Sequence, residues 1–75
     1  MHTKQERVAA GITQNTLAIR SGISRMRLSQ SENGEIQLKP EELETVRRVL
    51  RMEIERRARE LENMLSEISP TQVSA

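Results

Sequence analysis

The chain has 75 residues, enough for one small domain, and the absence of cysteine excludes disulfides. With a single histidine a Cys/His zinc site is excluded too, and we expect neither a metal nor a cofactor. The net charge is only +1, but the charges are unevenly distributed. Residues 1–34 carry five basic and two acidic side chains (+3), whereas residues 35–75 carry seven basic and nine acidic ones (−2). The basic excess in the first part favours its contact with a polyanion.

Apolar residues are too scattered for a membrane protein. No apolar stretch approaches the roughly 20 residues needed to cross a bilayer, and the polar N-terminus lacks the pattern of a secretory signal. We therefore expect the protein in the cytoplasm of a bacterium or of a phage-infected cell.

A capping box predicts a first helix from Thr3 to Ala10. Thr3 is followed three residues later by Glu6, and at this spacing the two side chains can satisfy the free backbone N–H groups of a helix start. Gly11 then ends the helix, because glycine readily adopts the left-handed conformation found just past a helix C-terminus.

Two further short helices follow. Thr13 is placed to cap a helix over about residues 14–20, and Ser24 to cap another over about residues 25–32. Ser21-Gly22 ends the first of these helices, and Asn33-Gly34 ends the second. Helix formers dominate the composition, which agrees with an all-α chain.

The second part of the chain contains a loop and a long helical stretch. Residues 35–39 form the loop, and a proline followed by glutamates suits the start of a helix over about residues 40–67. We expect either one long helix or two helices that meet near Arg51-Met52. Ser69-Pro70 is expected to end the helical stretch, and residues 69–75 to form a disordered tail.

The connection between the second and third predicted helices is informative because it is so short. Two helices joined by Ser21-Gly22-Ile23 must cross sharply, so that a small residue is needed where they touch, and Ala18 provides it. Gly22 suits the corner, since a tight turn here requires a positive φ. We expect a core formed by Leu17, Ile23 and Leu28.

The third predicted helix presents polar and cationic side chains on the side away from that core. With Leu28 directed inwards and about 100° between successive residues, five residues lie outside or on the flanks. They are Arg25, Met26, Arg27, Ser29 and Gln30. In a major groove arginine reads guanine, glutamine reads adenine and methionine contacts the thymine methyl group. Taken alone, these residues also fit an ordinary solvated helix face.

Several short motifs follow one another at fixed spacing. They are Arg7 to Ala18 (Arg-Val-Ala-Ala-Gly-Ile-Thr-Gln-Asn-Thr-Leu-Ala), Ser21-Gly-Ile-Ser24, Leu28, Glu32-Asn-Gly34 and the Pro-Glu-Glu-Leu at 40–43. Together they resemble the helix-turn-helix domain of the lambda-repressor/Cro type, the XRE-like family. The resemblance covers about residues 4–50 and implies a lambda-repressor-like all-α fold of four to five helices that binds double-stranded DNA.

The resemblance also implies roles for individual residues. The residues expected to contact bases are Arg25, Met26, Ser29 and Gln30. Those expected to contact phosphates are Gln14, Asn15, Ser24, Arg27 and Asn33. Arg7 and Glu32 match an ion pair that ties the first helix to the third. We interpret this pair as structural, because loss of one partner of a buried pair costs about 3–5 kcal/mol.

The chain departs from the family pattern in two places. Ser31 precedes Glu32-Asn-Gly34, where the family usually has an apolar residue. Thr3 and Lys4 stand one turn before Arg7, where an apolar residue is also usual. Both departures predict a smaller core.

Apolar residues recur along the C-terminal helical stretch. Leu43, Val46, Val49 and Leu50 resemble the family's fourth helix. From Ile54 onwards the apolar steps of 4, 3, 4 and 3 residues define a heptad seam. This seam either folds back onto the domain or pairs with a second copy of the chain, and its length favours pairing. The expected dimer interface is Val46, Val49, Leu50, Ile54, Ala58, Leu61, Leu65 and Ile68.

The sequence thus predicts a DNA-binding domain at residues 1–50 and a dimerisation helix at residues 51–68. The predicted protein is a transcriptional regulator, a dimeric repressor of phage or bacterial origin that reads a palindromic operator with half-sites roughly 34 Å apart. The alternative is an antitoxin-like or adaptor protein whose C-terminal helix binds a protein partner. An enzyme is not expected, because the chain has no cysteine, no tyrosine and no Gly-rich phosphate loop.

Overall fold

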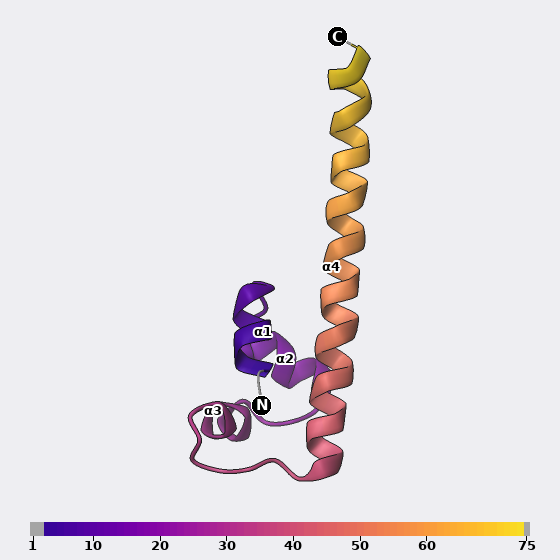
Figure 1. The fold of residues 1–75 in the computed structure, drawn as a ribbon. Coiled ribbons are helices and arrows are strands. Elements are labelled where there is room, and N and C mark those ends of the chain that lie inside the picture. Colours follow the sequence, from indigo (N-terminus) through magenta and orange to yellow (C-terminus); the bar gives the residue numbers. More distant parts are fainter. Residues whose placement is uncertain (1–2, 75) are drawn as a thin grey trace.

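Helices make up most of the chain in the computed structural model, which describes the backbone of residues 3–74 and the side chains of residues 3–68. The helices are α1 (Thr3–Ala9), α2 (Gln14–Ser21), α3 (Arg25–Glu32) and α4 (Pro40–Ser74). The three short helices gather beside the N-terminal half of α4, and its C-terminal half extends away from them (Figure 1). The predicted all-α, lambda-repressor-like fold is confirmed.

Side-chain caps begin the second and third helices. Thr13 Oγ1 accepts a hydrogen bond from the Thr16 N–H at 3.0 Å, and Ser24 Oγ accepts one from the Arg27 N–H at 3.2 Å. Both caps lie in extended backbone, as an N-cap requires. The predicted starts of α2 and α3 are therefore confirmed, whereas α1 ends at Ala9, one residue earlier than predicted.

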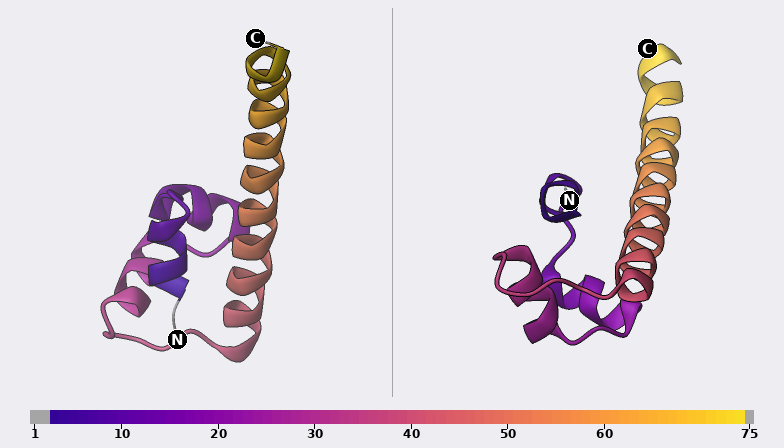
Figure 2. Two further views of the ribbon diagram at one scale, coloured as in Figure 1. Left: turned by 45° about the horizontal axis from the view of Figure 1, so that its top comes forward. Right: turned by 60° about the horizontal axis from the view of Figure 1, so that its bottom comes forward.

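A left-handed glycine makes the corner between α2 and α3. Gly22 has a φ of +75°, and its N–H donates to the Ala18 carbonyl at 2.9 Å. Non-glycine residues pay a steric cost in this conformation. The chain can therefore leave α2 and enter α3 after only three residues, so that the two helices cross in the views of Figure 2.

One apolar core lies among α2, α3 and the first half of α4. Its buried members are Ile12, Leu17, Ala18, Ile23, Leu28, Val46 and Leu50, with Ala10, Leu38, Val49 and Ile54 packed against them. The predicted inward positions of Leu17, Ile23 and Leu28 are thus confirmed. The core fixes the angle at which α3 presents its other side to the solvent.

The long helix differs from the expectation at its C-terminal end. α4 is one helix, which decides between the two alternatives, and its backbone stays helical to Ser74 rather than ending at Ser69-Pro70. A proline lacks one N–H group and crowds the preceding turn, but Pro70 lies near the end of a helix of 35 residues and does not stop it. The disordered tail predicted at residues 69–75 is therefore replaced by helical backbone, except for Ala75, which lies outside the described residues.

Part of the predicted dimer interface belongs to the core instead. Val46 and Leu50 are 0% and 1% exposed within the single chain. They have no surface left for a partner, because core residues of the same chain, chiefly those of α2, already cover them. Their assignment to a dimer interface is wrong, and Val49 and Ile54, which pack against the core, are only partly available.

A hollow marks the two places where the chain departs from the family pattern. It is lined by Thr3, Lys4, Ser31, Glu32, Gly34, Ile36, Gln37, Leu38 and Leu43. Ser31 and Thr3 supply small polar side chains where apolar ones are usual, and Thr3 is only 6% exposed. The expected reduction of the core thus appears as unfilled space between α1, α3 and the loop before α4.

Candidate nucleic-acid interface

The outer face of α3 is open to the solvent. Met26 is 71% exposed, Arg25 is also exposed, and Ser29 and Gln30 are partly exposed. Leu28 on the opposite side is buried, so the predicted inward and outward faces are confirmed. No acidic side chain stands between Arg25 and Gln30, and this face offers hydrogen-bond donors and one apolar side chain to a groove.

The N-terminal ends of α2 and α3 meet beside this face. A shallow depression there is lined by Arg7, Thr13, Gln14, Asn15 and Arg25. Free backbone N–H groups and the helix dipole make a helix N-terminus attractive to phosphate. Two such ends in one depression, with an exposed arginine between them, suit a DNA backbone that runs past α3.

A buried ion pair holds this depression in place. Arg7 Nε and Nη2 donate to the two carboxylate oxygens of Glu32 at 2.8 and 2.9 Å, and Arg7 Nη1 donates to the Ile12 carbonyl at 2.7 Å. The side chains of Arg7 and Glu32 are only 10% and 3% exposed. The predicted pair is present, and it ties α1 to the end of α3.

Gln14 joins the same pair. Its Nε2 donates to Glu32 Oε1 at 2.9 Å, a contact that was not predicted. Because an amide nitrogen carries two hydrogens, Gln14 keeps one donor for a phosphate while the other is held by Glu32. The carboxylate therefore orients a side chain that was predicted to contact DNA.

Three neighbouring side chains, those of Arg7, Gln14 and Lys4, keep the carboxyl group of Glu32 ionised. Burial alone would raise the pKa of its carboxyl group, but hydrogen bonds from Arg7 and Gln14 and the positive charges of Arg7 and Lys4 outweigh burial and hold the pKa below its ordinary value. The network is therefore fully charged and hydrogen-bonded at neutral pH.

Arg27, another predicted phosphate contact, is bound to α4. Its Nη2 donates to Glu42 Oε1 at 2.7 Å, and the same oxygen accepts the Lys39 N–H at 2.9 Å at the start of α4. The hydrogen bond from the Lys39 backbone and that from Arg27 lower the pKa of Glu42. Arg27 thus links α3 to α4, and any phosphate contact it makes must share the guanidinium with Glu42.

The remaining predicted contacts lie at the two ends of α3 and α2. Asn15 is exposed in the first turn of α2, and Ser24 and Asn33 flank α3 at its start and end. The Ser24 side chain already caps α3, which leaves its oxygen engaged. The structure therefore brings Gln14, Asn15 and Arg25 together in one depression. Asn33 lies at the other end of α3, just after its last residue.

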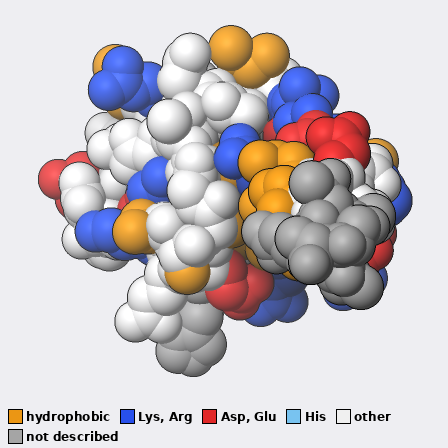
Figure 3. Space-filling model, turned by 90° about the horizontal axis from the view of Figure 1, so that it is seen from above, with side chains coloured by type: hydrophobic (Ala, Val, Ile, Leu, Met, Phe, Trp, Pro, Cys, Tyr) orange, Lys and Arg blue, Asp and Glu red, His pale blue; other side chains and the backbone are white. Residues whose placement is uncertain are grey.

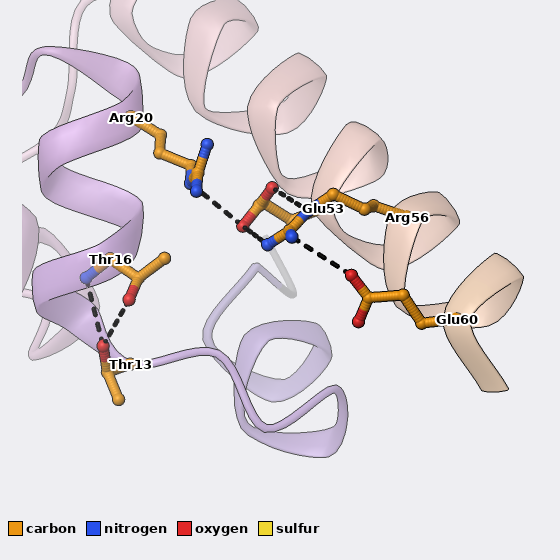
Figure 4. A network of polar contacts seen from close by, with 6 residues as sticks. All are labelled: Thr13, Thr16, Arg20, Glu53, Arg56 and Glu60. Carbon is orange, nitrogen blue, oxygen red and sulfur yellow. Dashed lines mark hydrogen bonds and ion pairs between the residues drawn. The ribbon is translucent and has the colours of Figure 1, made fainter. Parts of the chain in front are cut away.

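A second charged network joins α2 to α4 and was not predicted. Arg20 Nε lies 3.1 Å from Glu53 Oε1, and Arg56 donates to both Glu53 oxygens at 3.1 and 3.2 Å (Figure 4). Arg56 also donates to Glu60 at 3.2 Å. Glu53 is 4% exposed, and the hydrogen bond from Arg56, against the effect of burial, lowers its pKa.

The sequence contained a signal for this network. Glu53 lies three residues after Leu50 and seven after Val46, which is the spacing of the buried face of α4. A carboxylate at such a position needs a cationic partner. Arg57, four residues further along α4, has the spacing of such a partner, but Glu53 pairs with Arg56 and with Arg20 from α2.

The comparisons with known proteins agree with this geometry. The helix-turn-helix family of the Cro/C1 type, XRE-like, matches residues 4–57, and the chain belongs to this family. The family is one of DNA-binding regulators. Searches of curated proteins and of solved structures found no match. Within residues 3–74, no helix is long and apolar enough to cross a bilayer.

Proposed function

We propose that the protein is a sequence-specific transcriptional regulator that inserts α3 into the major groove of double-stranded DNA. The observation that carries this proposal is the solvent-exposed outer face of α3, free of carboxylates, beside the paired N-terminal ends of α2 and α3. Arg25, Met26, Ser29 and Gln30 face the bases. Gln14, Asn15, Ser24, Arg27 and Asn33 face the phosphates of the two groove walls.

The chain acts as a dimeric repressor in a bacterial or phage-infected cell and reads a palindromic operator. A regulator of this size represses by occupying a promoter, and self-association doubles the number of base contacts. Support for a dimer comes from the C-terminal half of α4, where Leu61, Leu65 and Ile68 are 59%, 61% and 49% exposed. Together with Ala58 and part of Ile54 they form the interface.

Selection of bound duplexes from a random oligonucleotide pool tests this function. The expected result is an enriched site with two-fold symmetry, bound with an affinity that falls steeply with salt because several phosphates are contacted. Enrichment of a single half-site without symmetry would contradict the dimeric mode. Absence of any salt-dependent duplex binding would contradict DNA recognition itself.

The alternative of an adaptor whose C-terminal helix binds another protein uses the same exposed residues of α4. It predicts a monomer in the purified chain, whereas the proposed regulator associates with itself. Sedimentation at micromolar concentration therefore separates the two functions.

A further inference from the structure

The charges of the molecule are mixed rather than gathered into one large basic surface. The net charge is only +1. Seen along α4 from its C-terminal end, basic and acidic side chains lie next to one another around the molecule (Figure 3). A surface of this kind produces little long-range attraction for a polyanion. Contact with phosphates therefore depends on where individual cations are held.

The two arginines of α3 lie on opposite flanks of the helix. With Leu28 directed into the core and about 100° per residue, Arg25 lies about 60° to one side of it and Arg27 about 100° to the other. Arg25 lines the depression at the N-terminal ends of α2 and α3, whereas Arg27 is directed towards the start of α4. A helix in a major groove about 12 Å wide has a phosphate backbone along each flank. The two arginines therefore face different groove walls.

The partner of Arg27, Glu42, is itself fixed by the backbone. Glu42 is the third residue of α4, and its Oε1 accepts the N–H of Lys39, the residue before the helix, at 2.9 Å. This contact is one half of a capping box. The Lys39 carbonyl accepts the Leu43 N–H at 2.9 Å, so both backbone groups of Lys39 are engaged. The carboxylate is therefore part of the rigid start of α4, and its side chain is only 23% exposed.

Arg27 is held at one nitrogen and free at the others. Its Nη2 donates to Glu42 Oε1 at 2.7 Å, a short, charge-assisted hydrogen bond, while the side chain remains 42% exposed. Nε and Nη1 make no hydrogen bond with the residues that the structure describes. Because a guanidinium carries five N–H groups in one plane, one edge can rest on Glu42 while another binds a phosphate.

Glu42 has two opposite effects on a phosphate contact by Arg27. An arginine that is free in solution loses rotamer freedom when it binds, and the ion pair removes most of that freedom when the domain folds. Hydrogen bonds from the Lys39 N–H and from Arg27 lower the pKa of Glu42, so the carboxylate is charged at neutral pH and offsets part of the positive charge. A test must therefore separate placement of the guanidinium from simple loss of a negative charge.

We propose that Glu42 is a positioning residue, which holds Arg27 on the flank of α3 so that the guanidinium binds a phosphate of the groove wall next to α4. The inference deepens the proposed DNA recognition and rests on it. Arg27 touches the DNA, and Glu42 acts only through Arg27. The start of α4 thereby contributes to DNA binding without a contact of its own.

A double-mutant cycle on the full chain tests the positioning role. Arg27→Ala is expected to weaken duplex binding about tenfold in the wild-type background. In the Glu42→Gln background it weakens binding only about twofold, because Arg27 is no longer held by a charged partner. The losses are the same for the selected site and for a random duplex of equal length, since a phosphate carries no sequence information. Glutamine is also accepted at this capping position, and circular dichroism checks that each variant is folded during the titrations.

The salt dependence of binding supplies a measurement that a purely structural role of Glu42 would not change. Loss of one phosphate contact in Arg27→Ala lowers the slope of log affinity against log salt by about 0.9, and Glu42→Gln loses part of the same increment. Glu41→Gln is the matched control, because Glu41 is an exposed neighbour whose side chain makes no ion pair within the described part of the chain. In that background the slope stays at the wild-type value and Arg27→Ala still costs about tenfold.

The outcomes separate this inference from the proposed function. Equal losses from Arg27→Ala in the wild-type and Glu42→Gln backgrounds would overturn the positioning role. A larger loss in the Glu42→Gln background would show that Glu42 competes with phosphate for Arg27, and would overturn it as well. In both cases the wild-type chain still binds duplex DNA, so the proposed function stands. Absence of salt-dependent duplex binding by the wild-type chain would overturn the function and the inference together.

Discussion

The two halves of α4 have similar apolar spacing but different surroundings. In the first half Val46 and Leu50 are 0% and 1% exposed, because core residues of the same chain, chiefly those of α2, pack on them. In the second half Leu61 and Leu65, on nearly the same side of the helix, are 59% and 61% exposed. The comparison shows that apolar periodicity identifies a face that needs cover, but does not say whether the cover comes from the same chain or from another.

The largest loss of stability is expected at the ion pair between Arg7 and Glu32, which joins α1 to α3 in the packed part of the molecule. Arg7→Ala removes the partner of the nearly buried Glu32 carboxylate and is expected to lower the free energy of unfolding by about 3–5 kcal/mol. Urea unfolding followed by circular dichroism measures the change. Arg25→Ala, an exposed arginine of α3, is the control and leaves the midpoint unchanged. An Arg7→Ala variant as stable as the wild type would contradict a structural role for the pair.

Matched leucines then test the two halves of α4 directly. Leu50→Ala leaves a cavity in the core and should cost about 2–5 kcal/mol of stability. Leu65→Ala removes apolar surface that the single chain leaves exposed, so it should weaken self-association in sedimentation and scarcely alter unfolding of the dilute monomer. Equal losses of stability from both substitutions would mean that Leu65 is covered within its own chain.

Two glutamines separate base recognition from phosphate binding. Gln30→Ala is expected to relax preference at one base pair by about 1–3 kcal/mol, whereas Gln14→Ala should weaken all duplexes alike. Neither residue lies on α4, so self-association should stay constant in both variants. Binding titrations with the selected site and with its single-base variants measure the effect. The reverse pattern would show that α2 rather than α3 faces the bases.

Acid should weaken the domain through three carboxylates that join its helices. The pKa values of Glu32, Glu42 and Glu53 are lowered from 4.5 in the folded state. The stability that they contribute is therefore complete above about pH 4.5 and is lost as the pH falls below it towards their folded-state values. Unfolding curves between neutral and acidic pH show the loss, and Glu53→Gln should flatten it. A pH-independent midpoint would contradict these ion pairs.

The smallest effect is expected at the hollow between α1 and α3. Ser31→Leu restores an apolar side chain where the family usually has one and should raise stability by about 1 kcal/mol, as cavity-filling substitutions commonly do. Ser66→Leu, on the exposed part of α4, is the control and should give no such gain. A destabilised Ser31→Leu variant would show that the hollow cannot accept the larger side chain.

Local signals in the sequence predicted most of the domain. Thr13 and Ser24 fixed the starts of α2 and α3, Gly22 fixed the corner, and the pairing of Arg7 with Glu32 followed from the family resemblance. These features depend on neighbouring residues or on a known motif, so they can be inferred without coordinates.

The remaining features depend on distances between segments far apart in the chain. That Arg27 binds Glu42, and that Arg20 reaches Glu53, follows from how α2 and α3 pack on α4, and no local pattern specifies it. Val46 and Leu50 were assigned to a partner because the heptad spacing is the same inside and outside the core. The end of α4 was misplaced because one proline near a helix terminus removes too little hydrogen bonding to stop the helix.

The continuity of α4 has a mechanical consequence. No glycine and no break lies between Val46 in the core and the exposed Ile68, so the connection behaves as a stiff rod rather than a tether. In the proposed dimer, once one domain has engaged its half of the operator, a rigid connector would hold the other at a fixed position and phase on the double helix. If two chains pair through the C-terminal half of α4, insertion of a whole number of heptads before Leu61 would move the permitted spacing in steps of about 10 Å per subunit, and a flexible insert of the same length would abolish this discrimination.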